Sequence, residues 1–389
     1  MQIKTRRESL YAPYDWYRQM RETQPVYQDP DGAWHVFRYA DVAGVLRDSA
    51  TFSSDEGRYV QADDSSPLNS SILRMDPPRH RQLRTLVSQA FTPRMVAHME
   101  VRISEITNEL LDQVAAKGEM DAISDLASPL PVMVIAELLG IPTEFREDFK
   151  RWSDALVSGN EETIKEKRQA LFQERDKMFG YFSQVLEERR AHPQDDLVSA
   201  LLSASVDGEH LSDLELLGFC GLLLVAGNET TTNLLGNLIL CLDENPGVVE
   251  RLRANRALVP GAVEEALRYY SPIRTMPRFA STTTTIGGQR IEAGQMVIPW
   301  ISSANRDEAF FPDADRFDSE REPNRHLGFG RGIHFCLGAP LARLEVKTAL
   351  GAMLDRLPGT WHVADVELSP VRNLIVFGTK NLPLTWGAW

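Results

Sequence analysis

The segment GFGRGIHFCLGAPLAR, residues 328–343, limits the possible folds of this chain more than any other stretch. Glycine occupies positions 328, 330 and 332, and Cys336 and Gly338 follow. Because glycine lacks a side chain, backbone N–H groups in such a stretch can approach a bound group closely. Pro340 suits the first turn of a helix, so we expect a helix to begin near it. The fold must therefore place Cys336 in a glycine-rich loop directly before a helix.

Cys336 allows more than one chemistry. A free cysteine is most often a small buried apolar residue. The positive end of a helix dipole lowers the pKa of a thiol, however, so this position suits a thiolate. A thiolate acts as a nucleophile if a base such as His334 lies beside it, or as a ligand of haem iron. A dinucleotide-binding loop does not fit, because the G-x-G-x-x-G spacing ends on Ile333.

Charge and cysteine content exclude several other classes. The formal net charge of −13 disfavours general binding to nucleic acid or to an anionic membrane. Cysteines occur only at positions 220, 241 and 336, which is neither a disulfide framework nor a zinc-ligand pattern. The first residues, MQIKTRRESLYAPYDWYRQM, contain no apolar export or anchor segment. We therefore expect a cytoplasmic protein without a membrane anchor.

The hydrophobic pattern predicts a mainly α protein with a smaller β region, in one domain spanning residues 1–389. Helices are expected over 94–190, over 211–242 and from Pro340. Strands are expected near 34–39, where a helix follows, and in 282–305 and 368–386. Residues 53–71 are polar and rich in turn formers, which predicts a long loop. Asp76 is expected to cap the helix that follows the prolines at 77 and 78.

The expected central helix contains a polar break. LLGFCGLLLVAGNETTTNLLGNLILCL, residues 216–242, is apolar except for the run 228–233 and Asn237. Burying these polar groups is costly unless they bond to one another or face water. Alternatively, a hydroxyl that bonds back to an earlier carbonyl, together with Gly227, loosens the helix there. Such an opening would admit dioxygen and water, and Glu229 and Thr230 would pass protons.

Four motifs in the expected order resemble one enzyme family. Phe329, Gly332, Cys336 and Gly338 form F-x-x-G-x-x-x-C-x-G, which resembles the haem-binding loop of the cytochrome P450 monooxygenases. AGNET, residues 226–230, is similar to their oxygen-binding sequence. DPPRHRQLR, residues 76–84, and VEEALRYYSP, residues 263–272, are similar to their D-P-P-x-H-x-x-x-R and E-x-x-R motifs. The resemblance extends from residue 76 to residue 345.

The resemblance implies a cytochrome P450 fold, in which haem b lies between a long central helix and the cysteine loop. Cys336 is then the axial ligand of the iron, and Phe329, Gly330 and Ala226 contact the haem. The resemblance assigns the two propionates to His80, Arg84, Arg278 and His334. Thr230 and Glu229 are expected to deliver protons to bound dioxygen, and Glu265, Arg268 and Arg321 to form a buried structural network.

The implied activity is hydroxylation of a small or medium hydrophobic compound, such as a terpenoid, steroid, fatty acid or macrolide-like molecule. Dioxygen is the co-substrate, and electrons come from NAD(P)H through a reductase and a ferredoxin-type partner. The expected substrate pocket consists of Leu222, Val225, Ala226, Ile273, Thr275, Met276 and Phe377. Arginines within 74–94, with Arg325, Arg331, Arg343 and Lys347, are candidates for a ferredoxin-docking patch. We expect a monomer, with residues 53–71 and helices around 152–182 covering the pocket.

Three alternatives remain at the level of sequence. A peroxygenase on the same scaffold would use peroxide directly, but peroxide-using members typically lack the Glu229–Thr230 pair. A haem protein that senses gas or carries electrons would need neither this pair nor a wide apolar pocket. A thiol-nucleophile enzyme would bind no haem at all.

Overall fold

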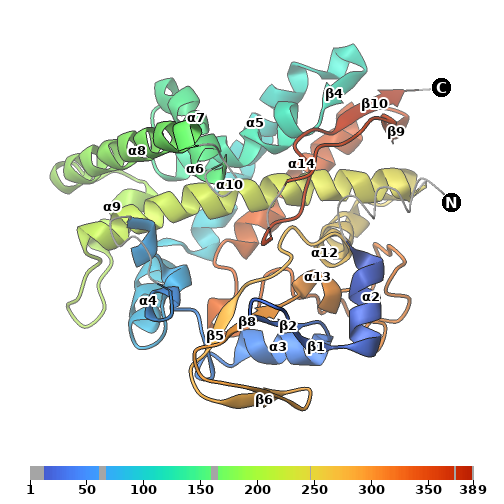
Figure 1. The fold of residues 1–389 in the computed structure, drawn as a ribbon. Helices are drawn as coiled ribbons and strands as arrows, with labels where there is room; N and C mark the ends of the chain where they lie inside the picture. The colour runs from blue at the N-terminus through green and yellow to red at the C-terminus, as the bar shows by residue number, and fades with distance from the viewer. Residues whose placement is uncertain (1–12, 61–66, 159–164, 246, 372–373, 388–389) are drawn as a thin grey trace.

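The computed structural model describes residues 13–60, 67–158, 165–245, 247–371 and 374–387, and most of these are helical (Figure 1). The longer helices are α4 (Arg79–Ala90), α5 (Pro93–Asp112), α6 (Pro129–Leu138), α7 (Arg146–Ser158), α8 (Lys165–Ala191), α10 (Asp213–Glu244), α12 (Val259–Tyr269) and α14 (Ala339–Arg356). The shorter ones are α2 (Tyr14–Thr23), α3 (Tyr39–Arg47), α9 (Leu197–Ser203), α11 (Val248–Ala254) and α13 (Ile301–Ala304). The predicted α-rich class is confirmed.

The strands form three small sheets. The largest has the order β1-β2-β8-β5-β3, with β2 and β8 parallel and the other pairs antiparallel. A second sheet has the order β4-β10-β9, and β6 and β7 form a hairpin. The strand bounds are β1 (Val26–Gln28), β2 (Trp34–Val36), β3 (Phe52–Ser53), β4 (Glu119–Asp121), β5 (Arg278–Ala280), β6 (Thr284–Ile286), β7 (Gln289–Ile291), β8 (Met296–Pro299), β9 (Thr360–Val363) and β10 (Pro383–Gly387).

Helix α10 crosses the middle of the molecule and carries the predicted buried apolar stretch (Figure 1). A capping box fixes its start: the hydroxyl of Ser212 accepts from the N–H of Glu215, and the Glu215 carboxylate accepts from the N–H of Ser212. Helices α6, α12 and α14 all pack against it. A helix covered on several sides needs apolar residues all round, which explains why α10 shows no single apolar face.

Buried side chains gather in two clusters. The helical core includes Leu224 of α10 and Leu350 of α14, and the sheet core includes Val36 of β2 and Val297 of β8. Helix α14 begins at Ala339, next to the predicted residue Pro340, and follows directly after the cysteine loop. This arrangement places the loop where helical and sheet regions adjoin.

Two local predictions are wrong. The predicted helical run 94–190 is interrupted by β4, because these residues pair with β10 near the end of the chain. Asp76 does not cap α4, whose N-terminal flanking residue is Pro78 with no side-chain cap. The Asp76 carboxylate accepts instead from the hydroxyl of Ser53 and the N–H of Ser54. Ser53 and Ser54 lie more than twenty positions earlier in the chain, and their hydrogen bonds occupy the carboxylate that would otherwise cap α4.

Residues 53–71, predicted to be a loop, begin at the end of β3 and contain 3-10 turns at Glu56–Arg58 and Pro67–Ser70. Residues 61–66 of this stretch lie outside the described ranges.

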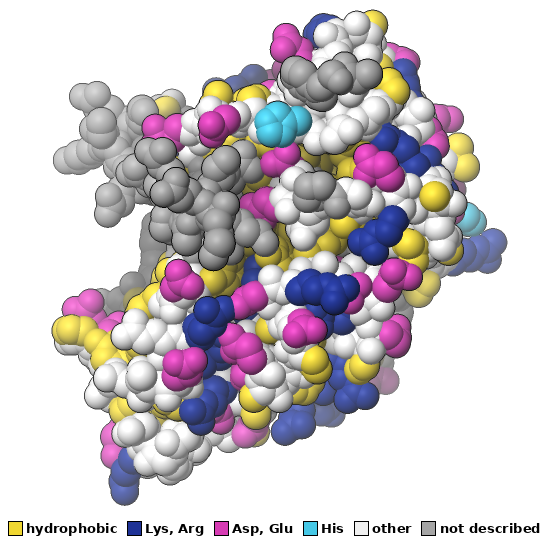
Figure 2. Space-filling model, turned by 90° about the vertical axis from the view of Figure 1, so that its right-hand side faces the viewer, with side chains coloured by type: hydrophobic (Ala, Val, Ile, Leu, Met, Phe, Trp, Pro, Cys, Tyr) yellow, Lys and Arg dark blue, Asp and Glu magenta, His cyan; other side chains and the backbone are white. Residues whose placement is uncertain are grey.

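The face shown in Figure 2 carries acidic and basic side chains side by side, with hydrophobic side chains in the hollows between them. Despite the net charge of −13, this face therefore presents no field of one sign. Among the helices that the structure describes, none combines the length and the apolar character needed to cross a bilayer.

Candidate active site

The cysteine loop is held against α3 and against the start of α14. The N–H of Cys336 donates to the carbonyl of Phe329 at 2.9 Å, which closes the loop on itself. Gly332 has a φ of +74°, and a Cβ there would meet the backbone of Arg47 at 3.0 Å. Both the left-handed conformation and the close approach of α3 require glycine. The glycines therefore fit the loop to its neighbours as well as freeing its N–H groups.

Burial raises the pKa of the Cys336 thiol above its usual value. Backbone N–H groups of Gly338 and Ala339 and the positive charges of Arg84 and Arg343 act in the opposite direction but do not outweigh burial. The predicted lowering by the helix start is thus present but insufficient in the free protein. A coordinated metal cation deprotonates a thiol outright, so the site suits a thiolate once a metal is bound.

Four predicted basic residues converge beside this loop. His80 and Arg84 lie on α4, Arg278 on β5, and His334 in the 3-10 turn Gly332–His334. The rings of His80 and His334 have centroids 4.2 Å apart. The guanidinium of Arg84 donates to the carbonyl of Phe335 at 2.9 Å. Helix α4 and the cysteine loop, more than 200 positions apart in the chain, therefore come together beside Cys336.

The protein itself supplies few hydrogen-bond partners for these four basic groups. The Nε2 atoms of His80 and His334 are buried without a hydrogen-bond partner in the described part of the chain. Arg278 is 5% exposed and donates to the carbonyl of Pro277 at 2.9 Å. Burial, followed by the charges of Arg278, His80 and Arg84, lowers the pKa of His334 to about 3. Burial likewise lowers the pKa of Arg278 to about 10, against the pull of Asp76.

The buried Arg278 guanidinium, the nearby Arg84 and the unpartnered imidazole nitrogens together call for an anionic acceptor. The two propionates of haem would supply acceptors for these groups, and Cys336 would supply the thiolate at the same place. The residues present therefore fit a haem at this site.

The predicted opening in α10 is absent, because the helix is continuous from Asp213 to Glu244. The hydroxyl of Thr230 does bond back to the carbonyl of Ala226, at 2.6 Å, without breaking the helix. Asn228 and Thr232 are satisfied by neighbours: Asn228 donates to Ser153, and Thr232 lies 3.0 Å from the carbonyl of Ala127. The structure thus favours the interpretation in which polar groups of the run bond to their neighbours, without a break in the helix.

The middle of α10 is more exposed than the stretches on either side of it. Residues 215–221 and 233–242 are largely buried, whereas Val225, Ala226, Glu229 and Thr230 keep partial exposure. These residues share the segment that the sequence predicts to face haem and oxygen. Accessible side chains in the middle of an otherwise covered helix are where a large planar group would lie.

Glu265, Arg268 and Arg321 lie in one buried cluster. Glu265 and Arg268 on α12 are both 0% exposed and share two hydrogen bonds, of 2.9 and 2.7 Å. The guanidinium of Arg321 donates to both Glu265 oxygens, at 3.1 and 3.2 Å. Burial lowers the pKa of Arg268, and Glu265 opposes that shift. Two cations thus depend on one carboxylate.

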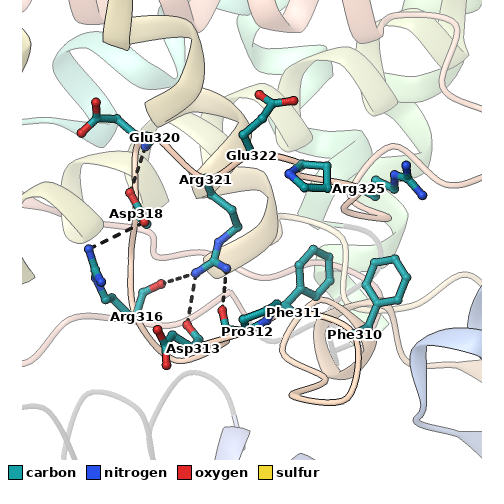
Figure 3. Close-up of a pocket in the computed structure, with 11 residues that line it drawn as sticks. Phe310, Phe311, Pro312, Asp313, Arg316, Asp318, Glu320, Arg321, Glu322 and Arg325 are labelled. Carbon is teal, nitrogen blue, oxygen red and sulfur yellow. Dashed lines mark hydrogen bonds and ion pairs between the residues drawn. The ribbon is translucent and has the colours of Figure 1, made fainter.

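A surface cavity of about 550 Å³ opens beside this cluster (Figure 3). The guanidinium of Arg321 points across it to the carbonyls of Pro312 and Asp313, at 2.7 and 3.1 Å. All lining residues come from 310–325. No residue predicted to contact haem or substrate lines it, so it is not the predicted substrate pocket.

The predicted pocket residues lie at the boundary of the two cores. Leu222 and Phe377 belong to or pack on the helical core, and Ile273 and Met276 pack on the sheet core. Ile273 forms an isolated β-bridge with Val376, the residue directly before Phe377. Leu222 and Val225 are partly exposed on α10.

Thr275 differs from the other pocket residues. It is 0% exposed, and its hydroxyl donates to the carbonyl of Pro299 at 2.8 Å. The hydroxyl is therefore already bonded to the protein backbone, and we no longer expect it to bind substrate.

Sequence reasoning missed the pair of side chains that fixes the cysteine loop to α12. Arg343 packs over the ring of Phe329 at 4.4 Å and donates to Glu264 at 2.6 and 2.8 Å. His326 lies 3.0 Å from the same carboxylate. Although burial favours the neutral acid, these hydrogen bonds lower the pKa of Glu264 to about 2. No sequence signal marks this contact, because Glu264 and Arg343 are far apart in the chain and follow no motif.

A family model described as cytochrome P450 matches residues 2–139 and 120–386, which together span nearly the whole chain. The chain belongs to the cytochrome P450 family. It is 44% identical to the putative cytochrome P450 YjiB of Bacillus subtilis over 380 residues, covering 96% of this chain and 94% of that one. It is also 44% identical to the erythromycin C-12 hydroxylase of Saccharopolyspora erythraea, covering 97% and 95%.

The solved structures agree. The substrate-free structure of CYP109E1 from Bacillus megaterium matches with a TM-score of 0.92 and 42% identity, covering 97% of this chain and 99% of that one. The same protein has been solved in complex with testosterone, and that structure matches with a TM-score of 0.88. This cytochrome P450 is thus an oxidoreductase of the haem-iron monooxygenase class, which uses dioxygen.

Proposed function

We propose that this cytochrome P450 is a one-domain, monomeric, cytoplasmic enzyme that hydroxylates a hydrophobic small molecule with electrons from a ferredoxin-type partner. The observation that carries the proposed site is the convergence of His80, Arg84, Arg278 and His334 beside Cys336. Two of these side chains have buried ring nitrogens without partners. This set of donors matches a dianionic, sulfur-ligated cofactor.

When bound, haem supplies the activation of dioxygen and the insertion of one oxygen atom into a carbon–hydrogen bond. The sulfur of Cys336 would hold the iron, and the N–H groups of Gly338 and Ala339 would hold the sulfur. The four basic residues would orient the macrocycle through its propionates. Phe329, Gly330 and Ala226 are proposed to pack against it.

Thr230 is the proposed proton donor at the distal side, with Glu229 as the acid that resupplies it. The Thr230 hydroxyl donates to the Ala226 carbonyl, so its oxygen is free to accept a proton from a neighbouring donor while it gives up its own. A hydroxyl held by a helix carbonyl moves a proton by a small rotation, with no movement of the backbone.

Substrate class follows from the pocket and from the relatives. The proposed pocket walls are apolar: Leu222, Val225, Ile273, Met276 and Phe377. NAD(P)H is proposed to supply electrons through the reductase and not to bind this pocket. One relative is named for hydroxylating erythromycin, and another has been solved with testosterone. We therefore propose a substrate of steroid or macrolide type. A screen for compounds that shift the haem spectrum from low to high spin, followed by product analysis, tests this proposal.

Thr230→Ala is expected to reduce dioxygen-driven product formation by roughly 10²-fold, the lower end of what a positioned proton donor contributes. Turnover driven by hydrogen peroxide should fall much less, because peroxide already carries the protons. Thr230→Ser keeps the hydroxyl and should retain most of the activity. Equal losses with dioxygen and peroxide would contradict the proton-donor role and would indicate general damage to the site.

The structure shows that several residues of the predicted ferredoxin-docking patch are already paired within the protein. Arg79 is committed to the start of α10, since it donates to Glu215 at 2.8 Å and lies 3.5 Å from Glu209. Arg343 and Lys347 are paired with Glu264 and Glu100. Among the predicted patch residues, the exposed arginines that form no ion pair within the described ranges are Arg81, Arg94, Arg325 and Arg331. We therefore propose these four as the basic patch that meets the acidic ferredoxin.

Arg331→Glu is expected to slow reduction by ferredoxin roughly tenfold at low salt and to flatten the dependence of that rate on ionic strength. The reason is that charge steers the encounter, and salt screens it. Lys177→Glu reverses a charge of similar exposure on α8 and serves as the control. Stopped-flow measurement of reduction at several salt concentrations decides. A rate for Arg331→Glu that follows that of the parent at every salt concentration would refute the docking patch.

A further inference from the structure

The turn of α10 that carries Glu229 and Thr230 is bonded to helix α7. Asn228 is 4% exposed, and its Nδ2 donates to the hydroxyl oxygen of Ser153 on α7, which is 0% exposed. Helix α7 packs against α10, α6 and α8. Buried amide and hydroxyl groups are stable only when they are bonded, so this contact fixes the distance between the two helices at this point.

The other end of the Asn228 amide is shared. The hydroxyl of Thr232 lies 3.1 Å from Asn228 Oδ1 and 3.0 Å from the carbonyl of Ala127. A hydroxyl has one proton and donates to one acceptor at a time. The amide is therefore held firmly on the α7 side and more loosely on the other side. The orientation of Asn228 depends mainly on Ser153.

The turn has little room to move independently of its neighbours. A Cβ added at Gly227 would meet Cδ1 of Ile135, on α6, at 2.8 Å. Helix α6 therefore lies directly on the backbone one residue before Asn228. With α6 against one side and α7 bonded to the next residue, the position of the turn is set by these two helices (Figure 1).

We propose that Asn228 is a positioning residue that ties helix α7 to the turn carrying Glu229 and Thr230, so that the seating of α7 sets how efficiently protons are delivered. The inference rests on the proposed roles of Glu229 and Thr230. A substrate that displaces α7 breaks or weakens the bond to Ser153, and the acid–alcohol pair then loses its alignment. Together with the predicted cover over the pocket by the helices around 152–182, the bond makes product yield per electron depend on how the substrate fits against α7.

The test compares Asn228→Ala, Ser153→Ala and the double variant in the haem-loaded enzyme. The measured quantity is product formed per NADPH consumed, with a purified ferredoxin and reductase and a substrate from the spin-shift screen. Each single variant is expected to lower this ratio roughly three- to tenfold, the ratio that one neutral hydrogen bond corresponds to. The double variant should lose no more than either single one, because both remove the same bond.

Matched controls separate positioning from general damage. Ser183→Ala removes a partly buried hydroxyl from α8, where it donates to the carbonyl of Phe179 at 2.9 Å, and should leave the ratio unchanged. Ser153→Thr keeps the hydroxyl and should retain the parental ratio. Haem content and peroxide-driven turnover should stay near parental values in Asn228→Ala and Ser153→Ala.

The outcomes distinguish two failures. If Thr230→Ala lowers the ratio but Asn228→Ala and Ser153→Ala do not, or if their losses add in the double variant, the positioning role of Asn228 is wrong. If Thr230→Ala also leaves the ratio unchanged, the proposed proton relay is wrong, and the inference that rests on it is overturned with it.

Discussion

Cys336→Ser is expected to abolish monooxygenase activity and to remove the long-wavelength absorption of the carbonyl-ligated ferrous form, which requires a thiolate ligand. A serine hydroxyl does not ionise in this buried site, where burial already raises the pKa of the more acidic thiol. The loss should be complete within detection, because the Cys336 thiolate would hold the iron and supply the electron density that the chemistry of bound haem requires. Spectra of the purified protein, recorded with and without carbon monoxide, provide the measurement.

The chain supplies its own control for this substitution. Cys220 and Cys241 are free, buried cysteines on α10, and burial raises the pKa of each thiol. Cys220→Ala should therefore keep both the spectrum and the activity. A thiolate spectrum that persists in Cys336→Ser would show that another residue holds the iron. The haem site proposed at Cys336 would then be wrong.

Glu265→Ala is expected to cost about 3–5 kcal/mol of unfolding free energy, the range for removing one partner of a buried ion pair. The loss leaves the guanidinium of Arg268, which is 0% exposed, and that of Arg321 without their shared carboxylate. Carbonyls of residues 305, 314 and 316 still accept hydrogen bonds from Arg268, but they do not neutralise its charge. Denaturant midpoints of the haem-loaded protein give the measurement.

Glu187→Ala is the matched control for this prediction. Glu187 forms an i,i+3 pair with Arg190 at 2.9 Å, the same spacing as Glu265 and Arg268, but its side chain is 75% exposed. Solvent screens such a pair, so its removal should cost less than about 1 kcal/mol. If the two alanine variants lower stability equally, the buried cluster does not have the structural role proposed for it.

Several parts of the fold were predictable from sequence because they depend on local chemistry. The predicted helix 211–242 matches α10 within two residues at each end, since a helix covered on all sides needs apolar residues all round. Pro340 marks the start of α14 within one residue. The Gly-Gly and Ala-Gly turns predict the strands β6, β7 and β8. In each case the signal lies within the element itself.

The wrong predictions have a different origin. Asp76 has the residue type of a helix cap, but Ser53 and Ser54 take its carboxylate. Arg79 looks like a free surface charge, but the carboxylate of Glu215 holds it. Polar side chains choose among all partners that the fold brings near, and local sequence does not reveal which partners those are.

By itself, then, the sequence determined the family, the α-rich class, the cysteine at the start of a helix and the acid–alcohol pair on the central helix. These features follow from short motifs and from hydrophobic periodicity, both of which act over a few residues. Only the tertiary structure decided that α4, β5 and the cysteine loop bring together two guanidinium groups and two imidazoles whose Nε2 atoms lack partners in the described ranges. It alone decided that Asn228 reaches Ser153, and that burial raises the pKa of the free Cys336 thiol. These outcomes depend on packing between distant segments, which sets desolvation and neighbouring charge, and no local pattern encodes them.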